Sequence, residues 1–110
     1  MVTVMEKWFL RPEVADHGLE IMQEMDDLLE SEAHEDPAWS SHARFYRSRT
    51  VPNEFIMIYP WRSVEEHGQL RAKEEPILAD FYARYCSAKR DISYYEELQV
   101  EVEHDNDHFN

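Results

Sequence analysis

The stretch Glu54-Phe-Ile-Met-Ile-Tyr-Pro-Trp61-Arg-Ser-Val-Glu-Glu-His67 decides how this chain folds. Its first eight residues alternate between two apolar sets, and this period of two predicts a strand over 54–61. Ser63 and Glu66 then match a capping box, because each side chain of such a pair satisfies a free amide of the first helical turn. A helix is therefore expected to begin at Val64. The two sets of the strand are Phe55, Met57, Tyr59 and Trp61 on one side, and Ile56 and Ile58 on the other.

A second strand is predicted just before the first. Residues 43–51 alternate in the same way, and Pro52-Asn53 supplies turn-forming residues. Two strands joined by so short a connection usually pair as a hairpin. The alternation of the earlier strand sets Phe45, Arg47 and Arg49 against Tyr46, Ser48 and Thr50.

Further elements are predicted on either side of this hairpin. Residues 2–10 form a strand with apolar side chains on both faces, and apolar residues at helical spacing predict a helix from Pro12 to about Ala33, with a loop over 34–41. Pro76 predicts a break in the helix that begins at Val64, because proline lacks an amide proton. Residues 92–103 alternate as a long last strand with one solvent-facing side, and 104–110 are a polar tail.

The composition limits the classes of partner. The 110 residues suit one domain, and the formal charge of −13 argues against nucleic acid and anionic membranes, which are themselves negatively charged. Cys86 is the only cysteine, which excludes an internal disulfide and suits a reducing compartment. The first residues lack the apolar segment of a signal peptide, so the cytoplasm is the expected location.

The order of these elements predicts an α+β fold. A β-α-β-β-α-β chain forms a four-stranded antiparallel sheet with two helices on one face, and the strands carry bulky apolar groups on both sides. An uncovered apolar sheet face is unfavourable in a monomer. A homodimer with sheet packed against sheet is therefore expected, and the enclosed face is where this reasoning places an active site.

The strand that ends in Trp61, followed by a serine that opens a helix containing His67, resembles the dimeric α/β-barrel (ferredoxin-like) superfamily. Within it, the chain is similar to the antibiotic-biosynthesis monooxygenase-like proteins. The resemblance covers nearly the whole chain, which makes 1–103 one dimeric α/β-barrel domain and 104–110 a C-terminal tail.

The resemblance implies an enzyme without a cofactor that acts on a small aromatic or polyketide-like substrate. Oxygenation and cyclisation both follow from removal of one proton, in a cavity between sheet and helices, and the sequence does not choose between them. A non-catalytic small-molecule-binding or accessory dimer is the first alternative. Haem degradation is a further one, although Leu70-Arg71-Ala72 stands where those relatives have their iron ligand.

Three residues are candidates for the catalytic step. His67 is the candidate base, because its reference pKa lies near neutral pH; a solvated helix histidine is the alternative. Tyr59 is the candidate hydrogen-bond donor into the cavity. Arg47 is the candidate group that stabilises the resulting anion, unless the arginines of its strand pair with Glu97, Glu101 or Glu103.

The candidate substrate-binding residues are aromatic or cationic. Trp61 is expected to stack on a flat substrate, although core packing explains it equally well. The others are Arg49, Tyr46 and Tyr82. No metal is expected, because the histidines lack ligand spacing apart from His104 and His108, which are better explained as a solvated chain end. The isolated glycines form no phosphate loop, so no tightly bound nucleotide is expected either. Which sheet face lines the pocket is left open.

Overall fold

The computed structural model describes residues 1–36, 39 and 41–102 and contains the expected order of elements. The strands are β1 (Val2–Phe9), β2 (Arg44–Arg47), β3 (Glu54–Trp61) and β4 (Asp91–Tyr95). The helices are a 3-10 helix (Pro12–His17), α1 (Gly18–His34) and α2 (Val64–Tyr85).

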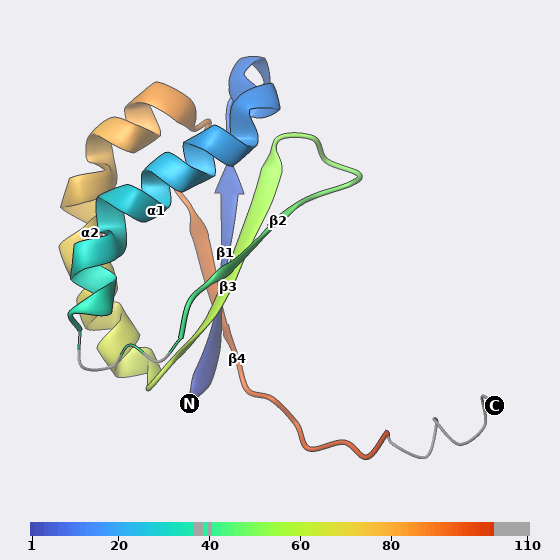
Figure 1. Ribbon diagram of the computed structural model, residues 1–110, viewed down its shortest axis with the longest axis vertical. Helices are drawn as coiled ribbons and strands as arrows, with labels where there is room; N and C mark the ends of the chain where they lie inside the picture. Colours follow the sequence, from blue (N-terminus) through green and yellow to red (C-terminus); the bar gives the residue numbers. More distant parts are fainter. Residues whose placement is uncertain (37–38, 40, 103–110) are drawn as a thin grey trace.

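The four strands form one antiparallel sheet in the order β2-β3-β1-β4, and both α-helices lie on the same side of it (Figure 1). This confirms the predicted ferredoxin-like α+β fold. The register places Val4 opposite Tyr59 and Trp8 opposite Phe55, all of them buried beneath the helices. The alternation of β1 and β3 therefore provides the inner face of the sheet.

The core between sheet and helices is built on large side chains. Trp8 packs edge-on against Phe81, with ring centroids 5.7 Å apart, and both side chains are almost fully buried. Met25 of α1 and Leu78 of α2 complete this cluster. Burial of each such side chain contributes roughly 1.5–3 kcal/mol, so the helix-covered face accounts for most of the packing energy.

The predicted helix from Pro12 to Ala33 is in fact two elements. A 3-10 helix runs to His17, and α1 then extends from Gly18 to His34. Gly18 is buried against Phe55, where a Cβ atom would lie 2.2 Å from the ring. A glycine is required where α1 begins, because any side chain there would collide with β3.

The serine cap at the start of α2 is confirmed, whereas the break at Pro76 is not. The reciprocal half of the capping box is also absent among the described residues, because the carboxylate of Glu66 accepts from the Ser63 hydroxyl at 2.9 Å and from Arg62 instead. The hydroxyl of Ser63 accepts a hydrogen bond from the amide of Glu66 at 3.1 Å. The helix then continues through Pro76 to Tyr85. Buried residues on both sides of the proline, Leu70 and Leu78, hold the two halves against the sheet, which offsets the lost hydrogen bond.

Strand β2 is shorter than its alternation predicted. It ends at Arg47, because the hydroxyl of Ser48 accepts hydrogen bonds from the amides of Thr50 and Val51 at 3.2 and 2.9 Å. These side-chain bonds begin the turn early. Arg49 therefore lies in the turn and not on the strand.

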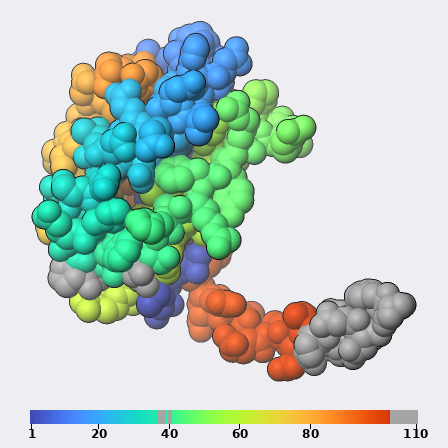
Figure 2. Space-filling model, viewed as in Figure 1, coloured from blue at the N-terminus to red at the C-terminus, as the bar shows by residue number. Residues whose placement is uncertain are grey.

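The predicted long last strand is also wrong in extent. Strand β4 ends at Tyr95, which pairs with Thr3 close to the start of β1, so little of β1 remains to pair with later residues. Residues 96–102 continue as an arm that projects from the body (Figures 1 and 2). Its exposed side chains include Leu98, Val100 and Val102. Glu103 and the predicted tail over 104–110 lie outside the described residues.

The face of the sheet opposite the helices carries apolar side chains. Met5, Ile56 and Ile58 are half-buried there, and within residues 1–36, 39 and 41–102 no helix covers them (Figure 1). In the same part of the chain, neither helix has the length and apolar character needed to cross a bilayer.

Candidate functional site

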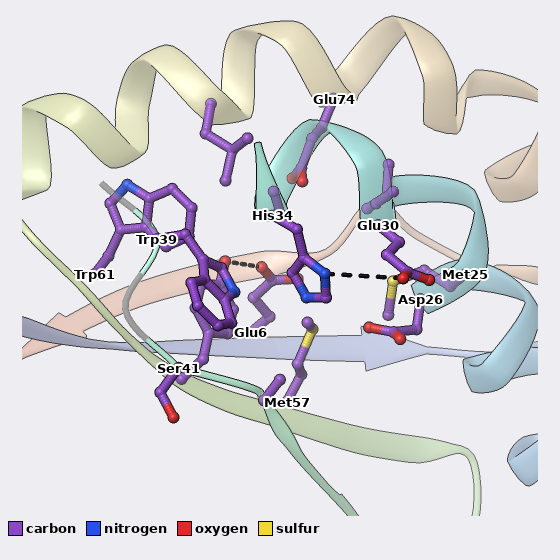
Figure 3. A pocket seen from close by; sticks show the side chains of 15 residues that line it. Glu6, Met25, Asp26, Glu30, His34, Trp39, Ser41, Met57, Trp61 and Glu74 are labelled. Atoms are coloured by element: carbon purple, nitrogen blue, oxygen red, sulfur yellow. Dashed lines mark hydrogen bonds and ion pairs between the residues drawn. The ribbon is translucent and has the colours of Figure 1, made fainter. Parts of the chain in front are cut away.

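A cavity lies between the sheet and the two helices. Its enclosed volume is about 40 Å³, below the usual range for small-molecule sites, and the wider space of about 470 Å³ around it includes open solvent. The cavity is on the helix-covered face, and not on the open face where the dimer argument placed an active site. Its polar and aromatic lining residues are Glu6, Asp26, Glu30, His34, Trp39, Ser41, Tyr59, Trp61 and Glu74 (Figure 3).

Charged residues are buried behind and along this cavity. Glu6 of β1, Glu74 of α2 and Arg90, which precedes β4, are 1%, 3% and 4% exposed. Burial of charge is unfavourable unless the groups are paired. The guanidinium of Arg90 lies 3.1 Å from Glu6, 3.0 Å from Glu74 and 3.0 Å from Glu75, so one cation serves three carboxylates.

A chain of hydrogen bonds connects β4 to β1 through His67. The hydroxyl of Tyr59 donates to Glu6 at 2.5 Å and lies 2.5 Å from Nε2 of His67, while Nδ1 of His67 lies 2.8 Å from the hydroxyl of Tyr94. Since Tyr59 donates its only hydroxyl proton to Glu6, a neutral His67 donates from Nε2 to Tyr59 and accepts at Nδ1 from Tyr94. Both ring nitrogens are therefore occupied.

His67 is placed behind Tyr59 and is not among the residues that line the cavity. Its side chain is fully buried, and burial lowers its pKa to about 4, so the ring is neutral near pH 7. Burial and the neighbouring Glu6 raise the pKa of Tyr59 well above its usual value, which keeps the phenol protonated. In this arrangement His67 orients Tyr59.

Glu74 combines access to the cavity with an unusual pKa. Figure 3 shows its carboxylate directed from α2 towards the cavity. Burial, opposed by Arg90 and assisted by Glu6, raises the pKa of Glu74 to about 7. A carboxyl group with this pKa is part ionised at neutral pH, so it can accept or release a proton there.

Two tryptophans form walls of the cavity. Trp61 ends β3 and is 1% exposed, while Trp39 forms an isolated bridge to it from the segment between α1 and β2. Among the described residues, Nε1 of Trp61 has no hydrogen-bond partner. Flat aromatic surfaces of this kind pack well on planar ligands.

The structure brings together only some of the predicted site residues. Tyr59 and Trp61 line the cavity, and His67 contacts both rings, with centroids 5.6 and 5.8 Å away. Tyr82 is buried in the core beside Trp8 and donates to Glu75.

The cationic part of the predicted site does not form around the cavity. Arg47 lies over the ring of Phe55 at 5.1 Å and is exposed, and Arg49 lies in the exposed turn after β2. Tyr46 is 49% exposed and shares the open face of the sheet with Ile56. These residues are separated from the cavity because β2 is an edge strand and its inner side chains pack near the start of α1.

The alternation of the first strand requires that either Glu6 or Lys7 points inward, and the structure buries Glu6, whereas the other carboxylates of the cavity were not predicted. A signal was present, because Glu6 stands between Val4 and Trp8 on one strand face, and Glu74 falls one turn from both Leu70 and Leu78 on one helix face. Acidic residues at otherwise apolar positions indicate buried charge. The partner, Arg90, carried no such pattern.

In the part of the chain that the structure describes, no group of three His, Cys, Asp or Glu residues is arranged to hold a metal ion.

Comparison with known proteins gives matches in structure alone. No family model matches the sequence, and no curated protein matches it either. A crystal structure of an antibiotic biosynthesis monooxygenase superposes with a TM-score of 0.63 at 17% identity, covering 89% of this chain and 99% of that one.

Two further solved structures give similar values. A putative antibiotic biosynthesis monooxygenase from Bordetella bronchiseptica has a TM-score of 0.68 at 10% identity, covering 88% of this chain and 96% of that one. SnoaB, a cofactor-independent oxygenase from Streptomyces nogalater, has a TM-score of 0.62 at 12% identity, covering 90% and 94%. The chain therefore has the fold of the antibiotic biosynthesis monooxygenase-like proteins, as its sequence resemblance predicted.

Proposed function

We propose that this chain, with the fold of the antibiotic biosynthesis monooxygenase-like proteins, removes a proton from a small aromatic or polyketide-like molecule in the cavity between sheet and helices. No cofactor takes part in this proposal. The observation that carries it is Glu74, a nearly buried carboxyl group that faces an aromatic-walled cavity and has a pKa of about 7. SnoaB, which shares this fold, is a cofactor-independent oxygenase, and this supports the choice of chemistry.

The proposed step uses groups that line the cavity. The ionised carboxylate of Glu74 accepts a proton from an acidic C–H or O–H group, while Trp61 and Trp39 hold the ring. The hydroxyl of Tyr59 donates its proton to Glu6, so it is no longer free to donate into the cavity and can only accept a hydrogen bond from the ligand. His67 is here a positioning residue, because its two nitrogens are occupied and it does not reach the cavity.

The carbanion formed in this step has two fates. Addition of O₂ gives a peroxide anion, which takes the proton back from Glu74 to become a hydroperoxide. Loss of the remaining C–H proton and of the outer oxygen as water then leaves a carbonyl group where a methylene group stood. Attack on a carbonyl group of the same molecule closes a ring instead, and the proton on Glu74 then returns to the new alkoxide. The first fate is an oxygenation and the second a cyclisation.

The molecule that acts is proposed to be a homodimer. Met5, Ile56 and Ile58 lie half-buried on the open sheet face, and a second copy packed there would remove this apolar surface from water. The free thiol of Cys86 is consistent with a reducing compartment, and the cytoplasm is the proposed location.

Proton exchange tests the proposal before the natural substrate is known. 2-Tetralone carries an acidic methylene group between an aromatic ring and a carbonyl group, and in D₂O its exchange is followed by proton NMR under argon. We expect the protein to accelerate this exchange, and Glu74→Gln to return it to the rate in buffer. Glu65→Gln, an exposed change on the same helix, is the matched control and should exchange like the wild type.

The outcomes separate the alternatives. Binding of 2-tetralone without faster exchange would support the non-catalytic binding dimer instead. Exchange that persists in Glu74→Gln would remove Glu74 as the base. Haem degradation is decided separately, because a Soret shift on mixing the protein with haem would favour it.

A further inference from the structure

The charge of the cavity differs from what an anionic ligand requires. Four carboxylates line it, from Glu6, Asp26, Glu30 and Glu74, and no lysine or arginine does so among the described residues. Arg90 is already shared by three carboxylates at 3.0–3.1 Å, and the imidazole of His34, which lines the cavity, lies 3.8 Å from Glu30. A ligand that enters the cavity therefore meets an excess of negative charge.

One of these carboxylates is deeply buried and has a single cationic partner. Oε1 of Glu74 pairs with Nη2 of Arg90 at 3.0 Å, and within the described part of the chain no other donor is recorded for it. The residue is 3% exposed, and its carboxylate is directed towards the cavity (Figure 3). Because Arg90 is shared with Glu6 and Glu75, a ligand that donates a further hydrogen bond to Glu74 would be stabilised.

The aromatic walls of the cavity also favour a cationic ligand. The rings of Trp39, Trp61 and Tyr59 line the cavity together with the carboxylates. The face of an aromatic ring carries partial negative charge and attracts an organic cation by about 0.5–2 kcal/mol. Figure 3 shows Asp26 and Glu30 on the α1 side of the cavity and Trp61 at its other end, so one small molecule can contact both.

We propose that the ligand of this cavity is an aromatic molecule that carries a protonated amine. Its ring lies against Trp61 and Trp39, and its ammonium group faces Asp26 and Glu30. The inference rests on the proposed function and names the substrate class for it. The predicted arginines do not reach the cavity and so do not stabilise the anion that forms when the proton is removed. The ammonium group of the ligand itself would balance that negative charge.

Three ring compounds that differ in charge test this selectivity. Tyramine is a cation, 4-ethylphenol is neutral and 4-hydroxyphenylacetate is an anion, and each is titrated into the full-length ¹⁵N-labelled protein while the indole N–H signals of Trp39 and Trp61 are followed. We expect tyramine to bind about tenfold more tightly than the anion, with the neutral phenol between them. Added salt should narrow the difference, because it screens charge.

Matched substitutions on α1 locate the ammonium site. Asp26→Asn and Glu30→Gln should each weaken tyramine binding several-fold and leave 4-ethylphenol unchanged. Asp27→Asn is the control, because Asp27 is the next residue but does not line the cavity. It should change neither affinity.

The possible failures are distinct. Equal binding of all three compounds, tighter binding of the anion, or no effect of Asp26→Asn and Glu30→Gln would overturn the charge selectivity and leave the proposed function standing. If none of the compounds shifts either tryptophan signal at millimolar concentration, the cavity does not bind small aromatic molecules, and both proposals fail.

Discussion

Buried ionisable residues determine the chemistry at the scale of single side chains. Tyr59, Trp61 and His67 could be grouped from sequence, because strand alternation and the capping box fix their relative positions locally. The pairing of Arg90 with Glu6 and Glu74 could not, since it joins three elements that meet only in the folded chain. The role of a histidine also depends on what surrounds it, and only the structure shows both nitrogens of His67 occupied.

Glu74 gives a prediction on stability. Folding raises its pKa from 4.5 to about 7, so the folded state holds the proton more tightly than the unfolded state. Its contribution to the free energy of unfolding is fully favourable below pH 4.5 and is lost as the pH rises through 7, by about 3 kcal/mol in all. Between pH 5 and pH 8 the free energy of unfolding of the wild type should therefore fall by about 2 kcal/mol more than that of Glu74→Gln, as measured by urea unfolding. Glu65→Gln should have the same pH dependence as the wild type. If Glu74→Gln also had the pH dependence of the wild type, the raised pKa of Glu74 would be wrong.

His67 gives the opposite pH dependence. Folding lowers its pKa from 6.5 to about 4, so the unfolded state takes up the proton first and stability falls as the pH drops from 6.5 towards 4. His67→Gln, which stays neutral, should lose about 2 kcal/mol less than the wild type over that range. Thermal unfolding at pH 7 and pH 4.5 measures it, with the exposed His17→Gln as the control. If His67→Gln lost as much stability between pH 7 and pH 4.5 as the wild type, the lowered pKa of His67 would be contradicted.

Local patterns determine where elements begin, and long-range pairing determines where they end. The start of α2 at Val64 was predictable, because the capping contacts lie within four residues. The end of β4 at Tyr95 was not, because it depends on where β1 runs out of residues to pair with it. The continuity of α2 through Pro76 likewise depends on the sheet beneath it.

The two glycines of the chain give a matched test of the helix packing. Gly18→Ala places a methyl group against the ring of Phe55 and should destabilise the fold by about 1–3 kcal/mol. Gly68→Ala, within α2, meets nothing within 4 Å and should stabilise it by up to about 1 kcal/mol. Urea unfolding measures both. If Gly18→Ala were as stable as Gly68→Ala, the contact between α1 and β3 would be wrong.

At the scale of the whole molecule, one apolar face of the sheet is left uncovered by the described residues. The fold class followed from element order alone, but the position of the cavity on the helix side did not, because both faces of the strands are apolar in sequence. The open face and the cavity are therefore separate surfaces, one proposed for dimerisation and the other for the ligand.

Placing a charged side chain on the open face of the sheet tests whether this face forms the dimer interface. Wild-type protein should sediment at twice the chain mass of 13.3 kDa, and Ile58→Lys should sediment as a monomer, because lysine cannot be buried between two sheets without a partner. Gln69→Lys, on an exposed position of α2, should remain dimeric. A monomeric wild type at micromolar concentration would contradict the proposed dimer.

The central claim is that Glu74 removes a proton from a ligand held in the cavity. The most direct test is the pH dependence of the protein-catalysed exchange of 2-tetralone in D₂O. The rate above buffer should rise with pH as Glu74 ionises, reach half its plateau near pH 7, and be absent in Glu74→Gln. An exchange rate that equals the buffer rate at every pH, or that keeps the same profile in Glu74→Gln, would contradict the claim.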